Sequence, residues 1–235
     1  TKMTSLILDK GVVKGIRCEE KEFLGTSVIL ATGHSARDVY RYLRSENIDM
    51  EAKGLAIGVR LEHPSHLIDQ IQYHSPEGRG KWLPAAEYSM VRQVANRGVY
   101  SFCMCPGGVV VPAACGPEQI VVNGMSPSHR GGKWSNSGMV VEVRPEDILP
   151  ASLITPNQVK SADIIALEST SESGNPAEMA DDVLRPLLLQ EQLERMCWLQ
   201  GNRSQTAPAQ RMADFVNNRL SASLNESSYA PGLIA

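Results

Sequence analysis

Between residues 55 and 145 the sequence repeats one pattern, in which short apolar runs rich in β-branched residues alternate with glycine and proline. The runs are LAIGVRLEH (55–63), GVYSFCMC (98–105), VVVPAAC (109–115), QIVVNGM (119–125) and MVVEVRP (139–145). Runs of this length favour strands, and short connections favour antiparallel neighbours. The pattern therefore predicts an antiparallel sheet in sequence order. Pro64 predicts a short helix over 63–74, because proline suits the first turn of a helix.

The N-terminal residues predict a small meander of three strands within residues 4–31, with turns at Asp9-Lys10-Gly11 and Glu19-Glu20-Lys21. The last strand ends in VILA (28–31), whose continuous apolar character is typical of a strand covered on both faces. Thr32 and Gly33 then form a turn, and Ser35 is expected to cap a helix.

The last third of the chain predicts two helices, one beginning at Pro186 and one at Pro208, with Met212 and Phe215 facing inward. A polar linker is expected at 169–178. The predicted fold class is α+β, with an antiparallel sheet domain, a C-terminal helical part and the N-terminal meander. The predicted domains are 1–50 and 51–235, the second divided into a sheet over 51–170 and helices over 176–225.

Composition excludes several classes of protein. The chain has 235 residues, a formal net charge of −3 and 42% hydrophobic residues, without the basic surface that nucleic-acid binding requires. No apolar run reaches the roughly 18 residues that cross a bilayer. The five cysteines are odd in number and scattered, which indicates reduced thiols. We expect a cytoplasmic protein with neither nucleic-acid nor membrane partners, and the lack of a methionine at Thr1 suggests an internal fragment.

The segment Cys103-Met104-Cys105-Pro106-Gly107-Gly108 has two interpretations. In the first it is an active-site loop, because two glycines allow a ligand to approach the backbone and a thiol can contact the substrate. In the second the cysteines are small buried residues at the end of a strand, and Pro-Gly-Gly is a turn. The Cys-x-Cys spacing matches neither dithiol sites of the Cys-x-x-Cys type nor zinc sites. No metal site is expected.

Residues 126–138 predict a long polar loop that combines cations, an amide and hydroxyl groups, at His129, Arg130, Lys133 and Ser135-Asn136-Ser137. The planar guanidinium of Arg130 suits an anion such as a carboxylate or a pyrophosphate. The alternative is a solvated surface loop without a ligand.

Segments over nearly the whole chain resemble the family of uncharacterised FAD-dependent dehydrogenases, a branch of the two-dinucleotide-binding-domain flavoproteins. These segments are ATG after the meander, KGLAIGVRLEHP, GRGKWLPAAEYSMV, VYSFCMCPGGVVVPAA, VVNGMSPSHRGGKWSNSGMVVEV and APAQRMADFV. The resemblance implies that residues 1–50 are part of an FAD-binding α/β domain. It also implies that residues 51–235 are a substrate or cap domain inserted into it.

The resemblance further implies FAD in the full-length parent, with NAD(P)H as a candidate electron donor. The implied cofactor-binding residues are Ala31, Thr32, Gly33, Pro106, Gly107, Gly108 and Arg130. These 235 residues lack the strand–GxGxxG–helix unit that holds the pyrophosphate in such proteins. We therefore expect no FAD on this chain alone, and the remaining FAD-domain segments of the same protein as its partner. No catalytic residue is assigned.

Three functions remain open. The first is the central fragment of an FAD-dependent oxidoreductase, a dehydrogenase in which the insert shapes the site of a small-molecule substrate over the flavin. The second is a non-catalytic ligand- or protein-binding module with a vestigial flavin-domain segment. The third is a thiol-based redox protein that uses Cys103 or Cys105.

Overall fold

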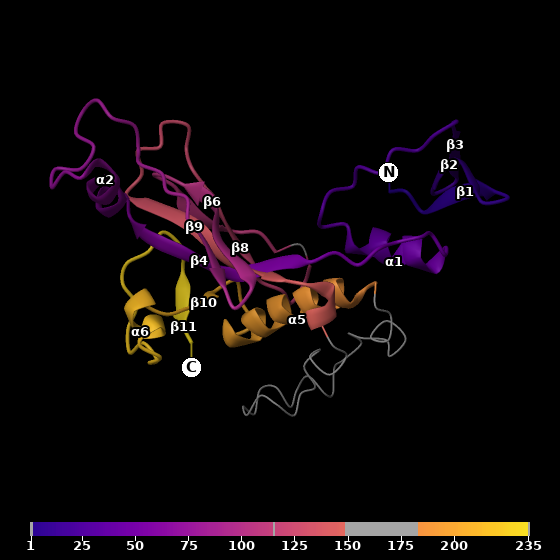
Figure 1. Cartoon of the computed structure of the whole chain (residues 1–235). Coiled ribbons are helices and arrows are strands. Elements are labelled where there is room, and N and C mark those ends of the chain that lie inside the picture. Colours follow the sequence, from indigo (N-terminus) through magenta and orange to yellow (C-terminus); the bar gives the residue numbers. More distant parts are fainter. Residues whose placement is uncertain (1, 115, 149–182, 235) are drawn as a thin grey trace. The chain divides into compact units, whose positions relative to one another are not determined.

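The computed structural model describes residues 2–114, 116–148 and 183–234. The chain is an α+β protein with several antiparallel sheets and few helices, which confirms the predicted fold class (Figure 1). It divides into two compact units, Thr1–Asn47 and Ile48–Ala235. The assignment of 1–50 and 51–235 to an FAD-binding and a substrate domain stays a prediction. Within the described residues, no helix is both long and apolar enough to cross a membrane.

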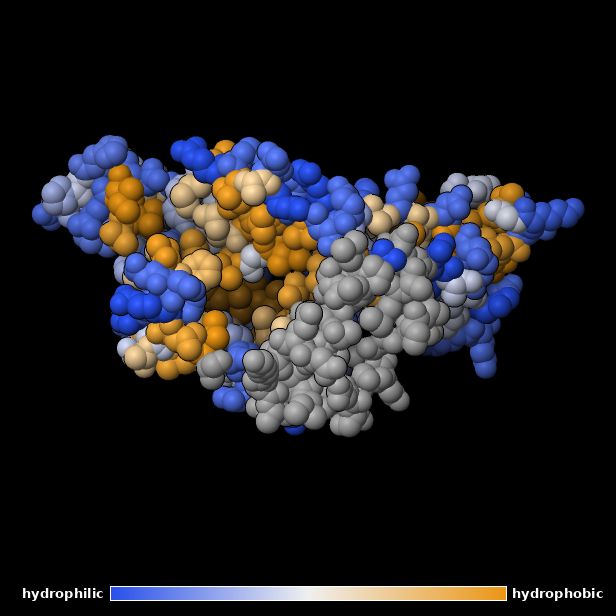
Figure 2. All heavy atoms as spheres, turned by 60° about the horizontal axis from the view of Figure 1, so that its bottom comes forward, coloured by the Kyte–Doolittle hydropathy of each residue, from blue (hydrophilic) through white to orange (hydrophobic). Residues whose placement is uncertain are grey.

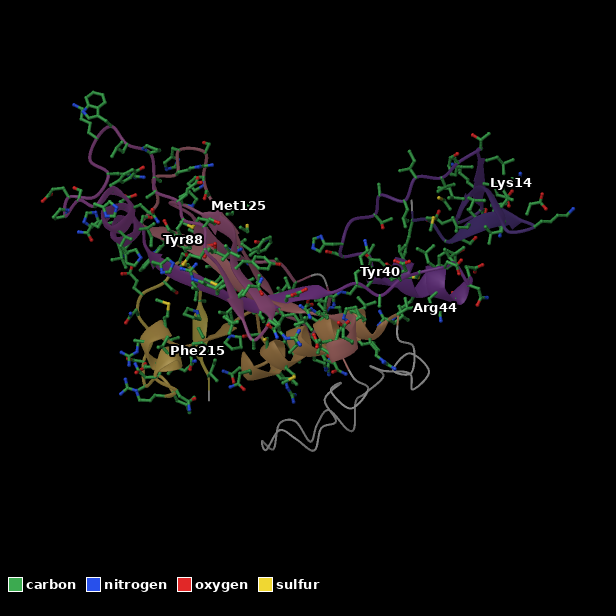
Figure 3. The ribbon with its side chains drawn as sticks, in the orientation of Figure 1. Lys14, Tyr40, Arg44, Tyr88, Met125 and Phe215 are labelled. Atoms are coloured by element: carbon green, nitrogen blue, oxygen red, sulfur yellow. The ribbon has the colours of Figure 1, made fainter. Side chains whose placement is uncertain are left out.

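The first unit contains a meander and one helix. Strands β1 (Ser5–Asp9), β2 (Val12–Cys18) and β3 (Lys21–Leu24) pair in order, both pairs antiparallel, and α1 (Arg37–Ser45) follows. Figure 3 shows Lys14 on β2 and Tyr40 and Arg44 on α1. The backbone N–H of Leu6 on β1 donates to the Tyr42 hydroxyl at 2.6 Å, which joins the meander to the helix.

Residues 28–31 do not form the covered strand that their composition predicted. Ile29 is 89% exposed and Leu30 is 53% exposed, and no described residue pairs with this segment in a ladder. An apolar segment becomes a strand only where neighbouring strands satisfy its backbone groups. The predicted cap at Ser35 is also wrong: Ala36 is the N-cap of α1, without a side-chain capping bond.

The second unit is built on a four-stranded antiparallel sheet with the strand order β4-β9-β6-β5. Its strands are β4 (Leu55–Pro64), β5 (Val91–Val94), β6 (Arg97–Cys105) and β9 (Trp134–Val143). Strands β7 (Val109–Pro112) and β8 (Val122–Met125) form a separate two-stranded sheet. The predicted sequence order of one sheet is therefore wrong. The cause is β9, which starts inside the segment predicted as a loop and pairs with β4 and β6.

The helical part of the second unit is smaller than predicted. Its elements are α2 (Ser65–Tyr73), η1 (Pro145–Asp147), α5 (Arg185–Gln200), β10 (Ala207–Ala209), α6 (Met212–Val216) and β11 (Pro231–Leu233). The helix predicted from Pro208 contracts to α6, because β10 pairs with β11 and takes up its first residues. Met212 and Phe215 are 54% and 65% exposed, so the prediction that they face inward is wrong. The predicted linker at 169–178 lies outside the described residues.

A cluster of buried apolar side chains lies where α5 meets β4 and β9. Ile148 and Leu188 are buried there, and Leu55, Val143 and Leu189 pack against them. Many other large apolar side chains are exposed, among them Val59, Trp82, Val91, Phe102, Met125 and Phe215. Figure 2 shows one face of the molecule, on which hydrophobic residues occupy much of the surface.

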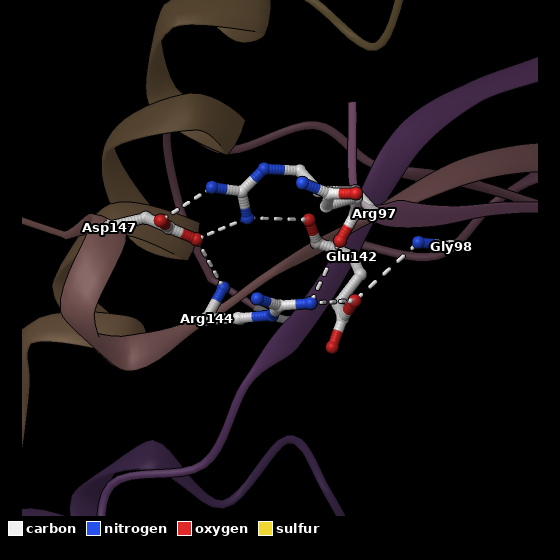
Figure 4. A network of polar contacts seen from close by, with 6 residues as sticks. Arg97, Gly98, Glu142, Arg144 and Asp147 are labelled. Carbon is white, nitrogen blue, oxygen red and sulfur yellow. Dashed lines mark hydrogen bonds and ion pairs between the residues drawn. The ribbon is translucent and has the colours of Figure 1, made fainter. Parts of the chain in front are cut away.

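Charged groups tie η1 to strands β6 and β9 (Figure 4). Arg97 binds both carboxylate oxygens of Asp147, and its Nη2 lies 2.5 Å from Oδ1. The backbone N–H of Arg144 donates to the same carboxylate at 2.7 Å. The hydrogen bond from Arg97, followed by that from Arg144, lowers the pKa of Asp147 to about 2. Glu142 accepts from Arg144 at 3.3 Å, which completes the network.

Candidate functional site

Three consecutive polar residues of β9, Ser135, Asn136 and Ser137, lie at the centre of the second unit. Their exposed fractions are 1%, 0% and 0%, which makes them the most buried polar side chains of the described chain. Side chains alternate along a strand, so the two serines point to one face of the sheet and Asn136 to the other. We call these residues the polar triplet. Buried polar groups require hydrogen-bond partners, and each member of the triplet organises a different set.

On its own face, Asn136 binds the guanidinium of Arg60 from β4. Arg60 Nη1 lies 2.5 Å from Asn136 Oδ1 and 3.3 Å from the carbonyl oxygen of Cys103. The second terminal nitrogen of Arg60, Nη2, donates to Asn123 Oδ1 at 3.0 Å. Asn136 Nδ2 is buried and has no hydrogen-bond partner. An unsatisfied buried donor costs about 1–3 kcal/mol, so this amide is a candidate contact for a ligand.

On the opposite face, Ser137 ends a chain of polar groups that includes Tyr88 and His63. The Tyr88 hydroxyl lies 2.6 Å from Ser137 Oγ and 2.7 Å from His63 Nε2. Figure 3 shows Tyr88 beside the sheet of the second unit. Burial lowers the pKa of His63, against the opposing charge of Glu62. Burial also raises the pKa of Tyr88, so a neutral imidazole lies beside a protonated phenol. Such a pair can accept and pass on a proton.

Ser135, on the same face as Ser137, fixes the Pro-Gly-Gly turn. Its Oγ accepts from the backbone N–H of Gly107 at 3.1 Å and lies 3.0 Å from Ser65 Oγ. Gly107 has φ +58°, and a Cβ there would lie 2.0 Å from the Arg130 carbonyl oxygen. A residue with a side chain would therefore separate the two backbones. Pro106, Gly107 and Gly108 are all buried, at and next to the contact between these two backbones.

The structure brings some of the predicted cofactor-binding residues together. Gly107 lies against the backbone of Arg130, whose exposed guanidinium pairs with Glu87. The space that a side chain would take at Gly107 is filled by this backbone. The contact of Pro106, Gly107, Gly108 and Arg130 with the cofactor stays a prediction.

The other predicted residues, Ala31, Thr32 and Gly33, belong to the first unit and are exposed. Gly33 has φ +80°, and no atom lies within 4 Å of the position that its Cβ would take. This open, left-handed glycine fits the close approach of a cofactor. Contact of the three residues with FAD is a prediction that the structure leaves open.

The sequence interpretation missed most of the side chains that form this site. His63 and Glu62 had no role assigned from the sequence, whereas Glu62 accepts from the backbone N–H of Ser228 at 2.9 Å. Arg60 and Tyr88 had no assigned role, and Asn136 was expected only as part of a polar loop. The available signal was the start of a strand at Trp134, whose side chains alternate between the two faces of the sheet. The hydrophilic sequence Ser-Asn-Ser conceals that strand. Among the described residues, no three His, Cys, Asp or Glu side chains are grouped to hold a metal ion.

Comparison with known proteins relates the second unit to an FAD-dependent family. The family described as "FAD-dependent protein, C-terminal domain-like" matches residues 54–235. A protein of Clostridium beijerinckii (strain ATCC 51743 / NCIMB 8052), named only "Uncharacterized protein", is 36% identical over 236 residues. The match covers 99% of this chain and 38% of that relative, so the chain spans about two fifths of the relative's length.

Proposed function

Because the chain belongs to the family "FAD-dependent protein, C-terminal domain-like", we propose that it is the central part of an FAD-dependent oxidoreductase, a dehydrogenase. The observation that carries the proposal is the extent of the match, which begins directly before β4 and includes every strand of the polar site. In this proposal the second unit shapes the binding site of a small-molecule substrate. FAD, when bound to the complete protein, supplies a hydride acceptor.

The residues of this chain would contribute proton transfer and orientation. We assign the proton to the pair of Tyr88 and His63, because their 2.7 Å contact joins a protonated phenol to a neutral imidazole. Where the oxidised carbon of a substrate carries an O–H or N–H group, loss of the hydride is accompanied by loss of that proton, which such a pair accepts. Asn136 points to the opposite face of the sheet, where its unpartnered Nδ2 would make a separate contact with a ligand.

The test is the visible absorption spectrum of the protein expressed from its complete reading frame, recorded before and after anaerobic addition of NADH or NADPH. A flavin spectrum supports the proposal, and bleaching by either nucleotide identifies the electron donor. The Tyr88→Phe variant should keep the flavin spectrum of the parent, because it removes only one hydroxyl. A colourless protein that also ignores added FAD would exclude the oxidoreductase and favour a non-catalytic binding module.

A further inference from the structure

The geometry around Cys103 and Cys105 points to a second redox site, and we propose that these two thiols close reversibly to a disulfide. The proposal does not rest on the flavin, because it uses only residues of the second unit. The two sulfur atoms lie 3.9 Å apart. A disulfide requires about 2.05 Å, so closure must bring the two sulfur atoms about 1.85 Å closer together.

The backbone between the two cysteines departs from a regular strand. The register of β6 against β9 shifts between Phe102 and Cys105, and Cys103 has φ +50°. Among the described residues other than glycine, Cys103 alone combines a positive φ with a position inside a strand. In a regular strand, residues two apart are separated by about 6.6–6.8 Å, near the upper limit for a disulfide. The bulge therefore gives the two cysteines a backbone geometry that differs from that of a flat strand.

The two thiols differ in access and in surroundings. Cys103 is exposed, whereas Cys105 is 7% exposed and donates from Sγ to the Cys103 carbonyl oxygen at 3.4 Å. Burial and the neighbouring Cys103 raise the pKa of Cys105, and the guanidinium of Arg60 opposes them. A cation beside a thiol favours the thiolate, which is the nucleophile in disulfide exchange. Arg60 therefore offsets part of the rise in the pKa of the buried thiol.

The oxidant in this proposal is a low-molecular-weight disulfide. The Cys103 thiolate attacks one of its sulfur atoms, which breaks the S–S bond, forms a mixed disulfide and releases one thiolate. The Cys105 thiolate then attacks Cys103 Sγ, forms the intramolecular disulfide and releases the second thiolate. The protein pair loses two electrons and two protons, and the small disulfide becomes two thiols.

The experiment is a redox titration of the complete protein in buffers with a series of ratios of reduced to oxidised glutathione. Each sample is quenched with acid, alkylated and digested with trypsin. Residues 98–130 form one tryptic peptide that contains Cys103, Cys105 and Cys115, so the titration is carried out in a Cys115→Ser background. We expect the peptide to lose about 2 Da and both alkyl labels together as the buffer becomes more oxidising.

Matched variants separate this pair from general thiol oxidation. Cys103→Ser and Cys105→Ser should each abolish the 2 Da loss, whereas Cys197→Ser should leave it unchanged. Arg60→Met should move the pH dependence of ring closure to higher pH, because the Cys105 thiolate loses its cation. Two labels retained at every glutathione ratio, or only separate mixed disulfides, would overturn the proposal. The flavin spectrum is read independently, so failure of either proposal leaves the other intact.

Discussion

At the scale of single residues, the site depends on a glycine, which has no side chain, as much as on its polar residues. A Cβ at Gly124 would lie 2.1 Å from Asn136 Oδ1 and 2.2 Å from Arg60 Nη1. The hydrogen bond between Arg60 and Asn136 therefore requires glycine on the neighbouring strand β8. Close packing of this kind responds to the addition of even one methyl group.

The first prediction concerns Gly124→Ala. We expect a loss of about 1–3 kcal/mol in the free energy of unfolding, because the methyl group displaces Arg60 or Asn136. Gly98→Ala is the matched control, since a Cβ there meets only atoms at 3.9 Å or more and glycine is unfavourable inside a strand. Denaturant unfolding of both variants measures the difference. Equal stability of the two variants would contradict the close packing at Gly124.

The second prediction concerns the imidazole of His63. Burial lowers its pKa below the ordinary 6.5 in the folded chain, so the unfolded chain binds the proton more readily. The folded state is therefore favoured above the unfolded pKa and loses stability as the pH falls below it. His63→Gln should reduce the loss of stability between pH 7 and pH 5, measured by denaturant unfolding at both values. The exposed His66, changed to Gln, should leave that loss unchanged.

At the scale of elements, the 3-10 turn η1 depends on a carboxylate that stays ionised. The pKa of Asp147 is lowered to about 2 in the folded chain, from a reference of 3.8. The stability that it contributes is complete above the unfolded pKa and disappears as the pH falls through the folded pKa. Asp147→Asn should therefore be less stable than the parent at neutral pH.

A pH series of unfolding curves checks this third prediction. The difference between parent and Asp147→Asn should shrink as the pH falls from about 4 through 2, because Asp147 then becomes protonated in the folded chain as well. Glu226→Gln serves as the control, because both side chains of the Lys133–Glu226 ion pair are exposed and such pairs contribute little to stability. A difference that persists at the lowest pH would show that Asp147 acts by something other than its charge.

The sequence predicted elements wherever local patterns and local partners agreed. The meander, β4, β6, α2 and α5 follow from apolar runs bounded by Gly, Pro or short polar turns. β9 was missed at its start, because Ser135, Asn136 and Ser137 look like a polar loop until distant partners are known. For residues 28–31 the error is the opposite one: a strand was predicted where none forms, since this apolar run has no paired neighbour among the described residues. Both errors come from contacts distant in sequence, which composition does not encode.

At the scale of the whole molecule, the two units differ in how completely their backbones are paired. β4 and β9 form a ladder of ten residue pairs in the second unit, from Leu55 with Val143 to Pro64 with Trp134. The first unit holds a three-stranded meander and the exposed apolar run at 28–31. Local stability follows such pairing, and unpaired exposed segments open at little cost in free energy.

The fourth prediction uses hydrogen exchange to compare these parts. Amides in the centre of the β4–β9 ladder should exchange slowly, and those of residues 28–31 should exchange rapidly in the 235-residue chain. In the protein expressed from its complete reading frame, residues 28–31 should become protected, if they join the parallel sheet that their composition suggests. Rapid exchange in both proteins would contradict that role, and slow exchange in the short chain would contradict the unpaired conformation.

The polar triplet also has a consequence for how this protein can be engineered. Because successive side chains of a strand point to opposite faces, inserting one residue before Ser135 within β9 would send Asn136 towards Tyr88 and both serines towards Arg60. Tyr88 would then face the amide of Asn136, and Arg60 would face the serine hydroxyls, so the hydrogen bonds described above would be lost. The same insertion in the loop at 126–133 would leave the alternation untouched. The three residues thus fix the register of β9. A library that varies loop length should place its insertions and deletions before Trp134.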